Sequence, residues 1–76
     1  MPHVIVKLYP GRTESQKLLC AEKITQAIIE SIGAEDKSIS VAFEEIQREE
    51  WKEAVYQPYI VSKENTLYKK PGYNMD

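Results

Sequence analysis

The sequence has few of the residues with which a small protein usually stabilises itself. Its 76 residues include one cysteine, Cys20, and one histidine, His3. A single cysteine cannot form an intrachain disulfide, and one thiol with one imidazole cannot complete a four-ligand zinc site, so we expect no metal site. Because a chain of this length buries only a modest core, we expect it to gain further stability by associating with other copies.

The chain also lacks an excess of basic charge and a long apolar segment. Ten Lys and Arg are set against twelve Asp and Glu, which gives a net charge of −2. The two signs are interleaved, so we expect no nucleic-acid partner. No apolar run approaches the roughly 20 residues that span a bilayer, and the first residues lack the pattern of a signal peptide. We therefore expect no membrane association and a cytoplasmic location, which the unpaired cysteine also favours.

The first half of the sequence predicts a strand followed by a helix. Residues 3–9 alternate in the manner of a strand, with one apolar face. Thr13 with Gln16 three positions later has the form of a capping box, and Gly33 suits the left-handed position that ends a helix. We therefore predict a helix that opens at Thr13 and runs to about Ile32. Its apolar sector consists of Leu18, Ala21, Ile24, Thr25, Ile28, Ile29 and Ile32.

A second alternating stretch, residues 39–44, predicts another strand. Strand, helix and strand in this order favour a right-handed crossover and a parallel pair, with the helix on one face of the sheet. Two strands alone are not stable in water, so we expect a partner subunit to pack on the other face. The predicted fold class is α+β, with one β-α-β unit in a single domain, residues 1–76, completed by oligomerisation.

The last third of the sequence is predicted to be a short helical turn and a C-terminal extension. Residues 49–55 predict the helical turn around Trp51, and Pro58 is expected to interrupt the stretch that follows. Lys70-Pro71-Gly72-Tyr73 fits a turn with proline before glycine. We find no internal repeat and no second domain in this region.

Pro2 is a candidate catalytic residue because of its position. A small second residue such as proline permits removal of Met1, which we expect, and this leaves a secondary amine at the start of the first strand. An α-amino group ordinarily titrates near about 7.7–8.0, and apolar surroundings or a nearby cation lower that pKa. The neutral amine could then act as a general base, which is typically worth about 10²–10⁴-fold in rate. The alternative is that Met-Pro merely begins an ordinary strand.

Several stretches together resemble the 4-oxalocrotonate tautomerase family. They are Pro2-His3-Val4-Ile5-Val6 and, in the loop and helix start that follow, Pro10-Gly11-Arg12-Thr13-Glu14-Ser15-Gln16-Lys17. Ser38-Ile39-Ser40-Val41-Ala42, Ile46-Gln47 ahead of Trp51, and Lys69-Lys70-Pro71-Gly72-Tyr73 are similar to the dimeric bacterial branch, whose members act on phenylpyruvate-type enols. The resemblance covers essentially the whole chain. It implies a tautomerase/MIF-like fold, an isomerase without a cofactor, and a homodimer rather than a hexamer.

The resemblance also implies roles for four residues. Pro2 would be the base and acid that moves a proton between the enol oxygen and a carbon, and Arg12 would hold the substrate carboxylate with its guanidinium. The alternative for Arg12 is a solvated position in the loop. Trp51 would form an apolar pocket wall that excludes water, and its alternative is a position in the core. Ser40 stands where the founding members carry a second arginine. It could still form a hydrogen bond with substrate, but a solvent-facing or interface serine is the expected alternative. This departure favours a 2-enol acid with an apolar or aromatic tail, such as phenylenolpyruvate, over a dicarboxylate.

Two other functions fit the same residues. Relatives with this amino-terminal proline use it protonated, as an acid in dehalogenation or hydration, and a proline pKa well above the working pH would indicate that chemistry. The other alternative is a non-catalytic oligomeric module that binds a small acid, because fold does not fix function. Retention of Met1 would favour this module, since the amine would not exist. His3 is expected to be structural or peripheral, because alternation turns its side chain away from the face of Val4.

Overall fold

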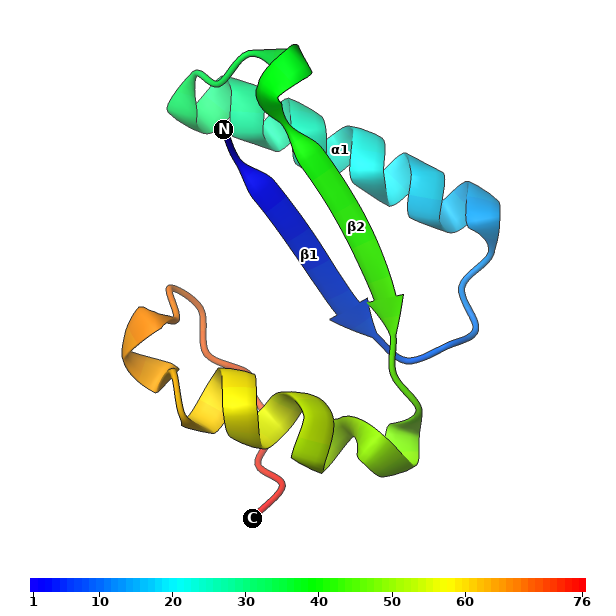
Figure 1. Cartoon of the computed structure of the whole chain (residues 1–76), viewed down its shortest axis with the longest axis vertical. Helices are drawn as coiled ribbons and strands as arrows, with labels where there is room; N and C mark the ends of the chain where they lie inside the picture. Colours follow the sequence, from blue (N-terminus) through cyan, green and yellow to red (C-terminus); the bar gives the residue numbers. More distant parts are fainter. The chain divides into compact units, whose positions relative to one another are not determined.

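The computed structural model describes all 76 residues, which form two compact units, Met1–Glu45 and Ile46–Asp76. The first unit is a strand, a helix and a second strand, with a short 3-10 turn before the second strand (Figure 1). Its elements are β1 (His3–Leu8), α1 (Glu14–Ile32), η1 (Asp36–Ser38) and β2 (Ser40–Glu45).

The two strands form a parallel pair, as predicted. His3 lies opposite Ser40 and Leu8 lies opposite Glu45, and α1 runs beside the pair in Figure 1. The fold class and the β-α-β order are therefore confirmed. The strand bounds differ from the prediction by one residue, because β2 begins at Ser40 and β1 ends before Tyr9. Ile39 is outside the sheet because its N–H donates to the carbonyl oxygen of Asp36 at 3.1 Å, which closes η1.

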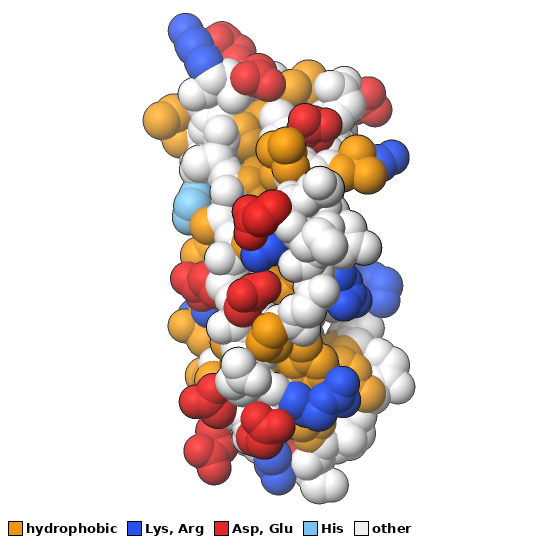
Figure 2. All heavy atoms as spheres, turned by 90° about the vertical axis from the view of Figure 1, so that its right-hand side faces the viewer, with side chains coloured by type: hydrophobic (Ala, Val, Ile, Leu, Met, Phe, Trp, Pro, Cys, Tyr) orange, Lys and Arg blue, Asp and Glu red, His pale blue; other side chains and the backbone are white.

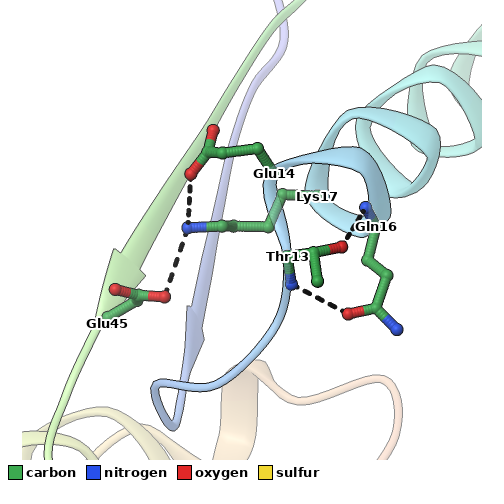
Figure 3. Close-up of polar contacts among 5 residues, drawn as sticks. All are labelled: Thr13, Glu14, Gln16, Lys17 and Glu45. Carbon is green, nitrogen blue, oxygen red and sulfur yellow. Dashed lines mark hydrogen bonds and ion pairs between the residues drawn. The ribbon is translucent and has the colours of Figure 1, made fainter.

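Both predicted ends of α1 are confirmed by their capping contacts. The Gln16 N–H donates to Oγ1 of Thr13 at 3.1 Å, and the Thr13 N–H donates to Oε1 of Gln16 at 2.9 Å (Figure 3). At the other end, Gly33 has a φ of 75° and its N–H donates to the carbonyl oxygen of Ile29. The helix therefore begins and ends where these local signals place it.

The predicted apolar sector of α1 is only partly covered within one chain. Ala21, Ile24 and Ile28 are half-buried, whereas Leu18 and Ile32 of the same sector are 63% and 68% exposed. A helix of 19 residues is about 28 Å long at 1.5 Å per residue, whereas a six-residue strand spans about 20 Å, so the sheet is too short to cover the whole helix. No side chain of β1, α1 or β2 is fully buried.

The second unit is mostly helical, and its longest helix contains a proline. It contains η2 (Arg48–Glu50), the π-helix η3 (Lys52–Val61) and η4 (Glu64–Thr66). The helical turn expected around Trp51 is present, but the interruption expected at Pro58 is wrong. In a π-helix each N–H donates to the carbonyl oxygen five residues back, as the Ser62 N–H does to that of Gln57. Pro58 has no N–H, so one of these hydrogen bonds is missing, but the helix continues past it to Val61.

The C-terminal segment after η4, residues 67–76, has no regular secondary structure. The chain bends at Gly72, within the turn predicted at Lys70-Pro71-Gly72-Tyr73, and the bend has no hydrogen bond of a closed turn. The buried side chains of the chain are Val55 and Tyr56 of η3, with exposed fractions of 4% and 5%. Acidic and basic side chains are interspersed on the face drawn in Figure 2. None of the helices combines the length and apolar character needed to cross a membrane.

Candidate active site

Pro2 lies immediately before β1 and is fixed to β2 through its carbonyl group. The Ser40 N–H donates to the carbonyl oxygen of Pro2 at 3.2 Å, whereas Met1 is fully exposed. While Met1 is attached, the Pro2 nitrogen belongs to a tertiary amide and has no useful basicity. Removal of Met1 would convert it into a secondary amine at a defined place, the amino end of β1.

Ser40 and His3 form a second contact beside Pro2. Nδ1 of His3 and Oγ of Ser40 share a hydrogen bond of 2.6 Å, and the two residues lie directly opposite each other in the sheet. The Ser40 hydroxyl therefore already has a partner within the chain. Alternation alone did not predict this contact, because it leaves the register between two strands open and a shift of one residue would turn the side chains to opposite faces.

Arg12 lies in the loop between β1 and α1. The preceding residue, Gly11, has a φ of 126°, which only glycine adopts readily. Arg12 is exposed and forms no ion pair within the chain. With Val6, Leu8 and Phe43 among its neighbours, it lines a hollow of about 190 Å³. An unpaired guanidinium beside an apolar hollow is suited to an anion with an apolar substituent.

The other cation beside this hollow, Lys17, is already neutralised. Nζ of Lys17 lies 3.1 Å from a carboxylate oxygen of Glu14 and 3.2 Å from one of Glu45 (Figure 3). The hydrogen bond with Glu14, followed by that with Glu45, raises the pKa of Lys17 above its ordinary value. Arg12 is therefore the cation of this loop that is available to a ligand.

One chain does not bring Pro2 and Arg12 together. They lie beyond opposite ends of β1, where six steps of about 3.3 Å place Leu8, the last strand residue before the Arg12 loop, about 20 Å from Pro2. That distance is longer than an arginine side chain. Of the predicted site residues in the first unit, only Pro2 and Ser40 are neighbours.

Trp51 lies in the second unit, directly after η2, and is half-buried. Its indole N–H donates to the hydroxyl oxygen of Tyr73 at 3.0 Å. Tyr73 was not among the predicted site residues, because the two residues are 22 positions apart and no local pattern links them. No group of three or more His, Cys, Asp or Glu side chains is placed to hold a metal ion.

Comparison with known proteins finds relatives that are similar over almost the whole chain. A family model described as "Tautomerase enzyme" matches residues 2–54. "Tautomerase PptA" of Pectobacterium carotovorum subsp. carotovorum (strain PC1) is 44% identical over 75 residues, which cover 97% of this chain and 99% of that protein. "Tautomerase PptA" of Escherichia coli (strain K12) is 40% identical over 77 residues, which cover 100% of this chain and 99% of that protein.

Solved structures of similar proteins agree with these matches. The crystal structure of YwhB, described as a homologue of 4-oxalocrotonate tautomerase, is 42% identical, has a TM-score of 0.60 and covers 62% of this chain and 77% of its own. TomN, a 4-oxalocrotonate tautomerase homologue in the tomaymycin biosynthetic pathway, is 30% identical, has a TM-score of 0.64 and covers 66% and 77%. The resemblance inferred from the sequence is confirmed: the chain belongs to the tautomerase family, among the 4-oxalocrotonate tautomerase relatives, and is an isomerase.

Proposed function

We propose that the mature chain, residues 2–76, is an enol–keto tautomerase whose general base and acid is the amine of Pro2. The observation that carries this proposal is the position of Pro2 in a member of the tautomerase family. Its carbonyl is tied to β2 by the Ser40 N–H, and the residue before it is fully exposed. Loss of Met1 would therefore expose an amine that is fixed in place and can meet a substrate.

The proposed reaction moves one proton within the substrate. The neutral Pro2 amine takes the proton from the hydroxyl on C2 of the enol acid, and the electron pair of that O–H bond becomes part of an enolate. The C2–C3 double bond then takes a proton from the Pro2 ammonium at C3, while C2 becomes a ketone and the amine returns to its neutral form. The amine serves first as base and then as acid, so this step requires no cofactor.

Arg12 is the proposed binding residue for the substrate carboxylate. Its guanidinium has no internal ion pair, and it would also stabilise the negative charge that spreads through the enolate. Ser40, beside Pro2, has a hydroxyl and no charge with which to bind a second carboxylate. We therefore propose a monocarboxylate enol with an apolar tail, such as phenylenolpyruvate, with Trp51 as an apolar wall of the pocket.

The proposed enzyme is a homodimer in which each site uses two subunits. Pro2 and Arg12 are too far apart in one chain to touch the same small substrate. The first unit has no fully buried side chain, and Ile5 of β1 and Leu19 of α1 are 47% and 54% exposed. A second subunit would cover such apolar surface and supply the missing half of the site.

A spectrophotometric assay of phenylenolpyruvate ketonisation tests this function. Pro2→Ala should lose at least about 100-fold in kcat, which is the lower part of the range for a positioned general base. Arg12→Ala should raise KM and lower kcat, whereas Lys37→Ala, which removes an exposed cation from the link before β2, should behave as native. Mass spectrometry of each protein verifies that Met1 is absent. Equal rates for the native and Pro2→Ala proteins would exclude the mechanism.

A further inference from the structure

The side chain of Trp51 is held by a tyrosine from the end of the chain. Its indole N–H donates to the Tyr73 hydroxyl at 3.0 Å, and the Tyr73 ring lies 5.8 Å from that of Tyr56, at an interplanar angle of 36°. Tyr56 is one of the two buried residues of the chain, with 5% exposure. Tyr73 therefore connects a half-buried tryptophan to the buried part of the second unit.

The residues that follow Tyr73 are also bound to η3. The Tyr56 hydroxyl donates to Oδ1 of Asn74, and Nε2 of Gln57 donates to Oδ1 of Asp76, both at 3.3 Å. The Asp76 N–H donates to the same Asn74 oxygen at 2.8 Å. In Figure 1 this tail, drawn in red, crosses the yellow helix η3. Tyr73 is thus kept in place from both sides, by the ring of Tyr56 and by the tail.

We propose that Tyr73 is a positioning residue of the tautomerase, which fixes the orientation of the Trp51 indole and thereby the pocket wall that receives the apolar tail of the substrate. This inference rests on the proposed function, in which Trp51 lines the site. An indole N–H is a donor only, and at a half-buried tryptophan it bonds either to an acceptor of the protein or to water. The tyrosine hydroxyl supplies that acceptor at one fixed place, so the flat face of the indole is held in one orientation.

The sequence offers a matched control for this role. Tyr68 is fully exposed, although it is only five positions from Tyr73 in the same segment. Tyr73→Phe removes the acceptor and retains the ring that packs on Tyr56. Tyr68→Phe makes the same chemical change where no indole is held. A difference between the two variants is therefore attributable to the hydroxyl that accepts from Trp51.

The first measurement compares two substrates of different tail. For phenylenolpyruvate, Tyr73→Phe should raise KM about three- to tenfold with little change in kcat, which is the ratio expected from one neutral hydrogen bond. For 2-hydroxy-2,4-pentadienoate, whose tail is small, KM should change less than twofold by the same reasoning. Tyr68→Phe should be native with both substrates. An equal change for both substrates, or none, would overturn the positioning role.

The second measurement observes the indole directly. Trp51 is the only tryptophan, so its N–H gives a single indole signal in a proton–nitrogen correlation spectrum. Tyr73→Phe should move this signal and speed its exchange with water, while Tyr68→Phe should leave it unchanged. An indole signal that is identical in the native and Tyr73→Phe proteins would contradict the hydrogen bond on which the inference depends.

A double-variant comparison separates this inference from the proposed function. Phenylalanine at position 51 has no N–H, so Tyr73→Phe should have no further effect on KM in a Trp51→Phe protein. The same loss in both backgrounds would show that Tyr73 acts on stability alone, and the inference would fail. Native kinetics for Trp51→Phe, with Pro2→Ala inactive, would also overturn it and leave the proline mechanism intact. Native rates for Pro2→Ala would instead remove the proposed function itself.

Discussion

Mixing two inactive variants should restore activity if each site is shared between subunits. Pro2 and Arg12 of one chain are separated by the length of β1, about 20 Å, so they cannot act on one small substrate. In a symmetric dimer each site would then combine Pro2 of one subunit with Arg12 of its partner. A mixed dimer of Pro2→Ala and Arg12→Ala subunits has one site with both native residues and one site with neither.

The expected recovery follows from these proportions. When equal amounts of the two variants are unfolded together and refolded, half of the dimers are mixed, so the sample should regain about one quarter of native activity. Ketonisation of phenylenolpyruvate measures it, and native mass spectrometry verifies the mixed dimers. As a control, Pro2→Ala refolded with the double variant Pro2→Ala/Arg12→Ala contains no native Pro2 and should stay inactive. Mixed dimers without recovered activity would refute the shared site.

Three further substitutions have outcomes set by single contacts. Ser40→Arg should raise kcat/KM for 2-hydroxymuconate relative to phenylenolpyruvate by about tenfold, because a guanidinium can bind the second carboxylate; an unchanged ratio would count against the position of Ser40 in the site. The raised pKa of Lys17 means that its stabilising contribution is complete below its ordinary value of 10.5 and is lost as the pH rises through the higher folded value. At pH 8 the native protein should therefore have a higher thermal midpoint than Lys17→Met, and at a pH above the folded pKa of Lys17 the two midpoints should be equal. The same difference between the midpoints at both pH values would contradict the ion pairs. Gly33→Ala should lower the free energy of urea unfolding by about 1 kcal/mol because its φ is 75°, while Gly72→Ala, where φ is not positive, should have a smaller effect; equal losses would contradict the left-handed cap.

The parts of the fold that depend on local chemistry could be predicted from the sequence. The capping box at Thr13 and the left-handed glycine at position 33 each act within one helical turn, so they locate the ends of α1 without knowledge of the rest of the chain. Alternation likewise identified both strands to within one residue. The parallel pairing followed from the order of strand, helix and strand, which favours a helical crossover.

The parts that depend on distant partners could not be predicted in this way. The contact between His3 and Ser40 requires the register of the two strands, and the contact between Trp51 and Tyr73 requires the path of the C-terminal tail. Pro58 was misread because the usual rule for proline assumes hydrogen bonds four residues back, whereas those of η3 extend five. Leu18 is exposed because the sheet is shorter than α1, and the sequence of α1 contains no information about the length of the sheet.

The central claim is that the Pro2 amine is neutral at the working pH and accepts the proton of the enol. A nitrogen-15 NMR titration of protein labelled at proline tests it most directly, because the mature amino terminus is a secondary amine while the other three prolines are amides. We predict an amine signal whose pKa lies below the ordinary α-amino range of about 7.7–8.0, lowered by apolar surroundings and a nearby guanidinium. A pKa well above the working pH, or an amide signal at Pro2 because Met1 is retained, would contradict the account.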